Sequence, residues 1–567
     1  MLRSALTLFC FLAVAACGTD TTDPASGASS APGEFAAPPD AALAAIDTTD
    51  LRAFVAELSS DEYEGRGTGT PGEAKTVEYI ISRFEELGLV GGMPDGSFRQ
   101  SVPLRSVTVT EASPLTLTGP DEATETLTFG PDVIATTDQN VSDAALESAE
   151  MVFVGYGITN PGYDWDDFKD VDVTGKVLVS LVNDPPATDA EPNLFQADTL
   201  TYNGRWTYKY EEAERRGALG VLLIHTDESA GYPFSVLNSD PYGEHFTGVE
   251  PAENALDVQG WMSASAAERL AGLAGTTLEA WQEAAATRDF EPIALPVTAD
   301  LTLSIEQTTG VTGTNVVAKI PGASAPDEAI VYGAHHDHLG IDPAKEAAGE
   351  DGIYNGAIDN ASGTAMMMEI AEAFTSLPEP PARSVYFVTF SAEEAGLLGS
   401  AHFMENPPLP AASMVAMVNV DSGNLYGETD DIVGIGSERS DMAAYLSMAA
   451  EAEGMTVTPD QAPNQGLFFR SDQLAFARGG VPAVFINTGG TYRGKPADYA
   501  QTVRDRYRAE LYHQPSDELT PDLRFDGILQ QTRVAFRLGY GLATSGLTPE
   551  WRPSEAFAET RRQSQSS

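Results

Sequence analysis

The sequence predicts an α/β fold with a mixed, mostly parallel central sheet flanked by helices. From residue 311 onward, near-continuous apolar runs of strand length alternate with helical segments, which is the pattern of a buried, mostly parallel sheet. Between about residues 106 and 300, short strand-like runs recur, and this change of character indicates a separate β-rich α+β domain. The chain has 567 residues, of which 42% are hydrophobic, so it is long and apolar enough for one to three domains with sizeable cores.

The N-terminal segment is predicted to lie outside the fold. Arg3 precedes an apolar run over residues 5–16, which is too short to span a bilayer and fits a secretory signal. Val14-Ala15-Ala16-Cys17 resembles the bacterial lipobox, so residues 1–17 are expected to be a lipoprotein signal, with an ordinary signal peptide as the alternative. A glycine follows Cys17, which favours the outer membrane. Residues 18–44 are rich in Ala, Ser, Pro, Thr and Gly and are expected to form a flexible tether.

Residues 45–105 are predicted to form the first segment of the main domain. Two amphipathic helical patterns occupy much of it, the first over residues 51–58 and the second over residues 74–87. The glycine-rich sequence Glu64–Gly69 separates them. No Lys-Ser/Thr pair follows these glycines, so we interpret them as a turn rather than a phosphate-binding loop.

Residues 106–300 are predicted to form the strand-rich domain. Its apolar runs include Met151–Tyr156, Val177–Val182 and Val221–Ile224, with a helical stretch between the last two. His225 and His245 stand alone there, and an isolated histidine is more often structural than a ligand. We therefore expect no metal site in this domain.

Residues 301–548 are predicted to form the main segment of the first domain. Its expected strands lie at residues 315–320, 329–333, 385–390, 414–420, 432–435 and 483–486, and its expected helices include residues 363–377, 440–453 and 525–541. Residues 549–567 are polar and are expected to be a frayed tail.

Charge and cysteine content exclude several classes of function. Lys and Arg number 32 and Asp and Glu number 84, which gives a net charge of −52. A field of that sign repels phosphate backbones, so we expect no nucleic-acid partner. The cysteines are Cys10 and Cys17, both near the N-terminus, so the body has neither a disulfide framework nor a cysteine-based metal site.

Polar side chains follow the predicted strands of the main segment at the points where those strands end. Three strands run into His335-His336-Asp337-His338, Glu393-Glu394 and Asp421, and two loops carry Asp359 and His513. Because ligands bind outside the carboxyl ends of strands in open α/β sheets, these side chains can converge on one pocket. Imidazole and carboxylate ligands without thiolate suit zinc, or less selectively cobalt or manganese.

The same set of side chains can hold two metals. Two metals about 3.5–4 Å apart need a shared carboxylate, and together they can activate a water. Asp359 is a plausible bridge because its loop lies between the others in the chain. Glu393 and Glu394 are adjacent at a strand end and tend to point in opposite directions, so one can bind metal while the other acts as a general base.

These motifs, in this order, resemble those of metallopeptidase family 28, which includes bacterial leucyl aminopeptidases, aminopeptidase Y and glutamate carboxypeptidase. The matching motifs are GAHHDH at 333–338, GAIDNASG at 356–363, SAEEAGLLGS at 391–400, NVDSG at 419–423 and YHQPSDE at 512–518, and the opening at 59–80 is also similar. In the middle domain, residues 155–157, 175–182 and 215–225 resemble a protease-associated (PA) domain, which is commonly inserted in these enzymes. The resemblance covers about residues 45–545.

The resemblance implies a zinc-exopeptidase-like fold with a dinuclear site holding two Zn²⁺. In that scheme His335 and Asp421 hold one zinc, Glu394 and His513 hold the other, and Asp359 bridges them. Glu393 is the general base acting on the metal-bound water and later the proton donor to the leaving amine. Asp337 accepts a hydrogen bond from His335 and fixes its tautomer. Neither His336 nor His338 is a ligand.

The implied function is a metallo-exopeptidase that hydrolyses peptide bonds at chain ends, with an aminopeptidase favoured. The alternative, a carboxypeptidase of the glutamate-carboxypeptidase type, needs a basic clamp for a carboxylate. Residues 491–512 carry five Arg and Lys residues, although salt bridges to the abundant acids are the favoured explanation. Arg470-Ser471-Asp472 is a further candidate for substrate contact.

Two other classes of function are less favoured. A glutaminyl-cyclase-like acyltransferase would use one zinc, and a scaffold lipoprotein would need none; the complete ligand set argues against both. The expected partners are therefore peptide substrates, with the membrane reached only through lipidated Cys17. The protein is expected to be exported and anchored, most simply at the outer membrane.

Overall fold

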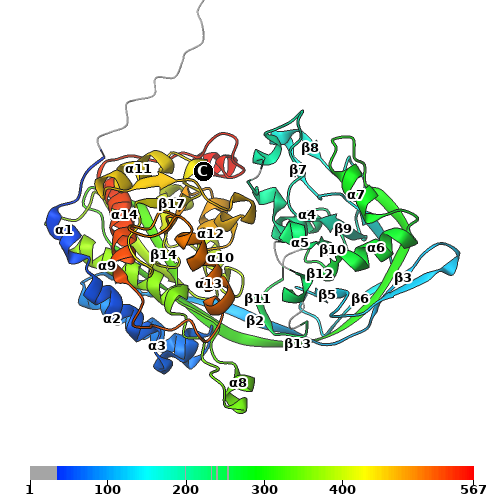
Figure 1. The fold of residues 1–567 in the computed structure, drawn as a ribbon, viewed down its shortest axis with the longest axis horizontal. Coiled ribbons are helices and arrows are strands. Elements are labelled where there is room, and N and C mark those ends of the chain that lie inside the picture. The colour runs from blue at the N-terminus through cyan, green and yellow to red at the C-terminus, as the bar shows by residue number, and fades with distance from the viewer. Residues whose placement is uncertain (1–34, 198, 231–232, 238–240, 252–253, 567) are drawn as a thin grey trace, which may run out of the picture.

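The computed structural model describes residues 35–566, apart from residues 198, 231–232, 238–240 and 252–253. Figure 1 shows two bodies joined by the long strands β2 (Arg99–Ala112) and β13 (Ile293–Ile320). We call the part before β2 and after β13 the main body, and the part between these strands the second body. The predicted signal and lipobox lie outside the described residues. In the described part, no helix is long and apolar enough to cross a membrane.

The main body is built on a mixed sheet in the order β1-β13-β15-β14-β16-β19-β17-β18. The pairs β15–β14, β14–β16, β16–β19 and β17–β18 are parallel, and the remaining pairs are antiparallel. This confirms the predicted fold class. The strands are β1 (Val90–Gly91), β14 (Ala325–His335), β15 (Arg383–Phe390), β16 (Met414–Asn419), β17 (Asp431–Ile435), β18 (Thr456–Thr458) and β19 (Ala483–Thr488).

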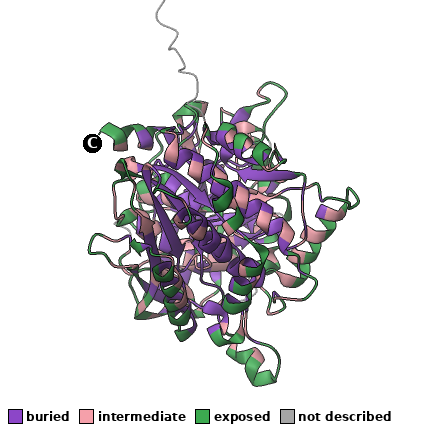
Figure 2. Cartoon of the chain, turned by 90° about the vertical axis from the view of Figure 1, so that its left-hand side faces the viewer, coloured by how far each residue is buried: buried purple, intermediate pink, exposed green. Residues whose placement is uncertain are grey.

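Helices cover both faces of this sheet, which is why its central strands are buried (Figure 2). The larger core lies under α1 (Asp40–Ala45), α2 (Thr48–Leu58), α3 (Pro71–Glu86), α9 (Gly363–Thr375), α11 (Met442–Ala452) and α14 (Phe525–Thr544). The opposite face packs against α10 (Leu398–Glu405) and α12 (Gln473–Arg478). Outside these layers lie α8 (Pro343–Ala348), α13 (Tyr499–Arg506) and α15 (Ala558–Ser566).

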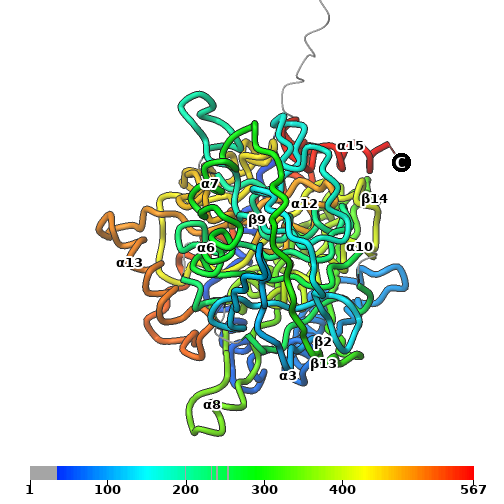
Figure 3. The backbone as a smooth tube through the Cα atoms, turned by 90° about the vertical axis from the view of Figure 1, so that its right-hand side faces the viewer, coloured from blue at the N-terminus to red at the C-terminus, as the bar shows by residue number. Residues whose placement is uncertain are grey.

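The second body has its own sheet, in which β6, β9, β10 and β12 are parallel neighbours and β5 joins β12 antiparallel. Figure 3 views this body from its outer side, with α6 and α7 in front of the main body. Trp281 of α7 stacks on Phe153 in the core on that side, and α4 covers the other face. Its helices are α4 (Trp206–Arg215), α5 (Asp227–Ala230), α6 (Ala264–Leu273) and α7 (Leu278–Ala285). Its strands are β3 (Leu115–Thr118), β4 (Thr124–Leu127), β5 (Val133–Thr136), β6 (Asp143–Phe153), β7 (Thr159–Asn160), β8 (Trp165–Asp166), β9 (Val177–Leu181), β10 (Gly220–His225), β11 (His245–Gly248) and β12 (Val258–Ser263).

The strands β2 and β13 run from one body into the other as an antiparallel ribbon. The second body also touches the main body through α4, where Arg478 forms an ion pair with Glu211 at 3.0 Å. The predicted domain limits at residues 106 and 300 fall inside β2 and β13, because each strand belongs to both bodies.

Both terminal segments are more ordered than their composition predicts. The tether prediction for residues 18–44 fails at its end, because Asp40–Ala45 is helical and Ala42 is buried in the main core. The prediction of a frayed tail is also wrong. Trp551 and Phe557 are buried in an aromatic cluster, and the Trp551 indole N–H donates to the Gly480 carbonyl at 2.9 Å.

Candidate active site

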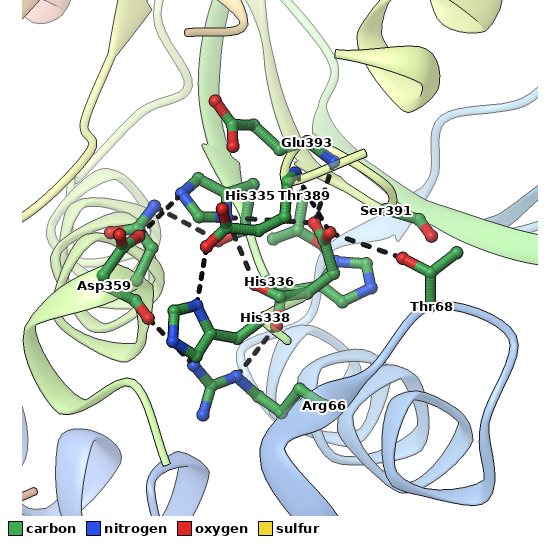
Figure 4. A network of polar contacts seen from close by, with 12 residues as sticks. Arg66, Thr68, His335, His336, His338, Asp359, Thr389, Ser391 and Glu393 are labelled. Carbon is green, nitrogen blue, oxygen red and sulfur yellow. Dashed lines mark hydrogen bonds and ion pairs between the residues drawn. The ribbon is translucent and has the colours of Figure 1, made fainter. Parts of the chain in front are cut away.

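The structure brings the predicted site residues together at the carboxyl edge of the main sheet. Figure 4 shows His335, Asp359 and Glu393 among them. His335 ends β14, Glu393 and Glu394 follow β15, and Asp421 lies two residues after β16. Asp359 lies in the irregular turn Ala357–Ser362 that leads into α9, and His513 lies on the loop after Tyr507–Leu511. Parallel strands therefore place the first four side chains, and two loops add the others.

The potential ligands form two groups that share Asp359. In the first, Nε2 of His335 lies 3.3 Å from Oδ1 of Asp359 and 3.4 Å from Oδ1 of Asp421. In the second, Nε2 of His513 lies 3.6 Å from Oδ2 of Asp359 and 3.0 Å from Oε2 of Glu394. Asp359 thus presents one carboxylate oxygen to each histidine. We call these the His335 group and the His513 group.

The spacing and chemistry of both groups fit zinc. Ligand atoms on a tetrahedral zinc, each about 2.0–2.1 Å from the ion, lie about 3.3 Å from one another. The nitrogen–oxygen distances in both groups are close to this value. Although Nε2 of His513 is buried and close to Glu394, it makes no hydrogen bond among the described residues, as expected of a nitrogen whose lone pair serves a metal.

The electrostatics of the site favour a bound cation. Burial acts to lower the pKa of His513, but Asp359 and Glu394 outweigh it and raise that pKa to about 10. Burial also acts to lower the pKa of His335, and the nearby carboxylates, led by Glu393 and Asp421, raise it well above the usual value instead. Each imidazole therefore lies in a strongly negative potential, which a metal dication would neutralise.

Glu393 lies beside the His335 group and points into the same space. Its carboxylate, Asp421 and His335 have ligand atoms within 4.8 Å of one another. Burial raises the pKa of Glu393 well above its ordinary value; His335 opposes this shift, and Asp421 and Glu394 add to it. A carboxyl with a raised pKa can hold a proton near neutral pH, as a general acid–base group must.

Asp337 supports the site differently from the prediction. Nδ1 of His335 lies 3.2 Å from the backbone carbonyl oxygen of Asp337 but 3.8 Å from its carboxylate. The carboxylate instead accepts the backbone N–H groups of Glu393 at 3.1 Å and Glu394 at 3.4 Å. The backbone of Asp337 thus orients His335, and its side chain fixes the turn that carries both glutamates.

His338 holds a role that the sequence did not indicate. Its Nδ1 lies 2.6 Å from Oε1 of Glu394, so it orients that carboxylate while the other oxygen faces His513. Burial and Asp359 act to raise the pKa of Glu394, but the hydrogen-bonded His338 and the nearby His513 imidazole outweigh them and lower it to about 2. Nδ1 of His336 lies 2.9 Å from the hydroxyl of Thr389 (Figure 4).

Arg66 is a second residue that the sequence analysis missed. It is fully buried, and its guanidinium donates to the backbone carbonyls of His336, Leu58, Asn355 and Gly356, at 2.7–3.0 Å. It therefore ties the His335 turn to the loop that carries Asp359 (Figure 4). The preceding residue, Gly65, lets the backbone beside Arg66 pack closely against the chain at Gly340. A Cβ at Gly65 would lie only 2.3 Å from the Gly340 carbonyl oxygen. The signal in the sequence was an arginine among glycines, which we interpreted only as a turn.

Asp517 holds the Asp359 loop from the other side. Its carboxylate accepts the backbone N–H groups of Ile358 and Asp359, both at 3.1 Å. Asn360 links the same loop to both neighbouring strand ends, by donating to the His335 carbonyl and accepting from the Ser422 N–H. Hydrogen bonds to Asp517 and to the two neighbouring strand ends therefore fix the loop that carries Asp359.

Comparison with known families agrees with this geometry. Residues 315–532, which carry all the potential ligands, match the model of peptidase family M28. This segment is an M28 metallopeptidase domain. An aminopeptidase from Bacillus subtilis is 34% identical over 116 residues, which cover 20% of this chain and 22% of that protein. A probable zinc metalloprotease from Pyrenophora teres f. teres is 33% identical over 116 residues, which cover 20% of this chain and 24% of that protein.

Other relatives of the M28 domain bear different names. A probable glutamate carboxypeptidase from Arabidopsis thaliana is 26% identical over 255 residues, covering 42% of this chain and 32% of that protein. This chain matches three curated relatives, two probable zinc metalloproteases of Pyrenophora and a mouse aminopeptidase, over about a quarter of their own length or less. Among solved structures, an aminopeptidase from Aneurinibacillus sp. strain AM-1 aligns with 90% of this chain and 97% of its own, at 18% identity and a TM-score of 0.49.

Two openings flank the potential ligands of the M28 domain. A cleft of about 690 Å³ is lined by Glu393, Glu394 and His513 on one side and by α4 of the second body on the other. Arg205, Arg470 and Arg478 also line it. A second cavity of about 460 Å³ adjoins the Asp359 and Asp421 loops, and apolar and amide side chains line it together with Arg504 and Arg508. Of the predicted substrate-contact sequence, Arg470 faces the cleft, whereas Asp472 is wholly buried.

The basic segment at residues 491–512 is partly neutralised by neighbouring acids. Arg493 pairs with Glu428 and Asp430, and Arg506 pairs with Glu510. Salt bridging, the favoured explanation of this segment, therefore accounts for these two arginines. Arg504 and Arg508 instead bond to glutamine side chains at the 460 Å³ cavity.

Proposed function

We propose that the protein is a zinc-dependent aminopeptidase that hydrolyses the first peptide bond of a peptide chain. The observation that carries this proposal is the shared position of Asp359, with one oxygen facing His335 and the other facing His513. Glu393 lies beside His335 and Asp421. It takes no part in the hydrogen bond from His338 that orients Glu394. The site therefore offers places for two metals and a separate carboxylate for proton transfer.

The residues divide between holding metal and moving protons. His335 and Asp421 would hold one zinc, Glu394 and His513 the other, and Asp359 would bind both. Two zinc ions there would lower the pKa of a water and polarise the carbonyl of the substrate. Asp337, Arg66 and Asp517 act on the backbone and keep these side chains in register.

Glu393 carries the proton through the reaction. It takes a proton from the attacking water and then delivers the proton to the leaving nitrogen. Its raised pKa suits this second task, since a strongly acidic carboxyl would hold the proton too weakly. Tyr512 stacks on the His513 ring at a centroid distance of 3.8 Å and lines the cleft, where its hydroxyl could donate a hydrogen bond to the substrate.

The position of the second body supports action at chain ends. Arg205, Trp206 and Thr207 face Glu393 and His513 across the cleft, so a long folded substrate would meet α4 before its backbone reached the potential ligands. We propose that this body is a PA-like domain that restricts the site to short peptides and free ends. Efficient cleavage within a folded protein would contradict this restriction.

A carboxypeptidase is the second candidate, and one observation favours it. Arg205 and Arg470 line the cleft beside Glu393 in a chain of net charge −52, and a guanidinium there could bind a carboxylate. The aminopeptidase is preferred because relatives with significant matches include aminopeptidases from bacteria and mammals and because salt bridges neutralise Arg493 and Arg506 of the basic segment.

Two peptides of one sequence distinguish these candidates. One has a free N-terminus and an amidated C-terminus, and the other is N-acetylated with a free C-terminus. With the full chain and added zinc, we expect cleavage of the first peptide alone, lost in Glu393→Gln and on chelation. Cleavage of the second alone would show a carboxypeptidase. A single zinc per chain with neither peptide cut would favour the cyclase-like alternative.

We also propose that the protein is exported and held at the outer membrane by lipidated Cys17. The lipobox resemblance and the following glycine support this proposal. Metabolic labelling with a fatty acid should mark the wild-type chain and not Cys17→Ala. Equal fractionation of both forms with the membrane would contradict the anchor.

A further inference from the structure

A second group of carboxylates lies between the helices α2 and α9 of the main body. Asp50 is in the first turn of α2, and Glu369 and Glu372 lie one turn apart on α9. Ligand oxygens of all three lie within 4.8 Å of one another. None of these residues belongs to the two groups that share Asp359. We call them the α2–α9 carboxylates.

The side chain of Glu369 is the observation that separates this group from an ordinary acidic surface. It is fully buried, with a relative exposure of 0%. Its Oε2 accepts the backbone N–H of Asp47 at 2.8 Å, whereas its Oε1 has no hydrogen-bond partner among the described residues. An unpaired buried carboxylate oxygen is costly, because it has lost water and gained nothing in exchange.

Charges around the group are mostly negative. Asp47, Asp50 and Glu372 all act to raise the pKa of Glu369, after burial, which is the largest cause. Arg83 of α3 is the basic group that acts on Glu372, and its guanidinium is hydrogen bonded to Glu86. Among the described residues, no cationic side chain pairs with any of the α2–α9 carboxylates. The fold has therefore gathered three carboxylates here, and none of them forms an ion pair with the nearby Arg83.

We propose that the α2–α9 carboxylates bind a calcium ion. Calcium takes oxygen ligands at about 2.3–2.6 Å, so the ligand oxygens of one ion lie no more than about 5 Å from one another, and the oxygens of this group, all within 4.8 Å of one another, satisfy that limit. The group contains neither nitrogen nor sulfur ligands, and this all-oxygen set favours a hard cation over zinc. Asp50 and Glu372 are half-buried, so water can complete the coordination.

Calcium at this place would join two parts of the main body. It would fix α2, which comes from the N-terminal segment, to α9. Helix α9 begins at Gly363, directly after the turn that carries Asp359, and α2 also contacts that turn. By holding α2 and α9 together, the ion would thus stabilise the turn that carries Asp359. This inference does not depend on the proposed peptidase activity.

Thermal unfolding of the full chain tests the proposal. The protein is freed of metals with a chelator, reloaded with zinc, and heated with calcium chloride or magnesium chloride at increasing concentration. We expect the Tm of the wild type to rise with the logarithm of calcium concentration, by roughly 2 °C or more at saturation. Asp50→Asn and Glu372→Gln, which alter half-buried positions, should lose this rise. Glu85→Gln, which removes an exposed charge from neighbouring α3, should keep it.

Each other outcome overturns the proposal in a defined way. If the Tm of the wild type does not change with calcium concentration, the proposal is wrong and Glu369 is instead kept protonated. An equal rise in Asp50→Asn and Glu372→Gln places the calcium elsewhere. A response to magnesium without a response to calcium excludes calcium as the ion. Zinc content and peptidase activity are measured on the same samples, so loss of the calcium effect is distinguishable from loss of the proposed function.

Discussion

His335 and His513 stand on opposite sides of Asp359, but the chain holds them by different means. His335 ends a buried strand, its side chain is 1% exposed, and its Nδ1 is oriented by the Asp337 carbonyl. His513 lies on a loop, its side chain is 33% exposed, and it has a φ of 57°. Its ring stacks on Tyr512, and among the described residues no hydrogen bond orients its Nδ1 as the Asp337 carbonyl orients that of His335.

This difference shows how an α/β sheet builds a site with both rigid and adjustable parts. The His335 group takes its positions from β14 and β16, which are fixed by the core. The His513 group combines a strand-end glutamate with a loop histidine in the left-handed region, which is strained for residues other than glycine. We therefore expect the first group to bind metal in a preformed geometry and the second to adjust on binding.

The largest expected effect concerns Glu393, which lies beside the rigid group. Glu393→Gln should lower kcat by about 10²–10⁴-fold, because the amide cannot accept and return a proton. Both zinc ions should remain, since none of the residues proposed to hold zinc is changed. Zinc per chain and steady-state kinetics on the free-amine peptide check this, with Glu85→Gln as the control for charge. Loss of zinc in Glu393→Gln would show instead that Glu393 is a ligand.

Removing one histidine at a time tests the comparison directly. His335→Gln and His513→Gln should each retain one zinc, and the zinc that His513→Gln retains should be the tighter. The reason is that a hydrogen-bonded orienting partner, which His335 has, typically changes metal affinity by about 10–100-fold. Competition with chelators of graded strength measures both constants. Tighter zinc in His335→Gln would reverse our ranking of the two groups.

Much of the site could be predicted because its side chains follow strands. The apolar runs ending at His335, Glu393 and Asp421 marked those positions, and parallel strands bring their ends to one edge. The contributions of His338, Arg66 and Asp517 could not be predicted in the same way. Three of the four carbonyl partners of Arg66 lie more than 260 residues away in the chain, and nothing local to Arg66 distinguishes a buried arginine from a solvated one.

The fold was likewise predictable where a local pattern exists. In β13, buried and more exposed residues alternate in the second body, whereas Asn315–Ala318 are continuously buried in the main sheet. The single strand β13 therefore passes from the second body into the main body without a break. The domain limit predicted at residue 300 falls inside this strand. In the tail, the single residues Trp551 and Phe557 give no periodic signal, although their burial anchors the segment.

Arg66 offers a smaller test of how the two groups are coupled. Arg66→Lys should lower activity and zinc affinity by about 10-fold, because one ammonium cannot bond the carbonyls of both loops. Arg66→Met should have a larger effect on stability. Burial lowers the pKa of Arg66 only to about 10, so the charge is present at neutral pH in the wild type. Arg99→Lys, an exposed arginine paired with Glu78, is the matched control.

The smallest expected effect comes from carboxylates that have no histidine beside them. Burial, followed by the charges of Glu372, Asp50 and Asp47, raises the pKa of Glu369 from 4.5 to about 8. Because the folded protein binds this proton more tightly than the unfolded chain, the resulting stability is fully present below pH 4.5 and is lost as the pH rises through about 8. In zinc-loaded, calcium-free protein, the Tm of the wild type should therefore fall between pH 5.5 and 8.5 by roughly 2 °C more than that of Glu369→Gln. Identical pH profiles would show that Glu369 does not titrate in this range, whereas added calcium should remove most of the difference by replacing the proton.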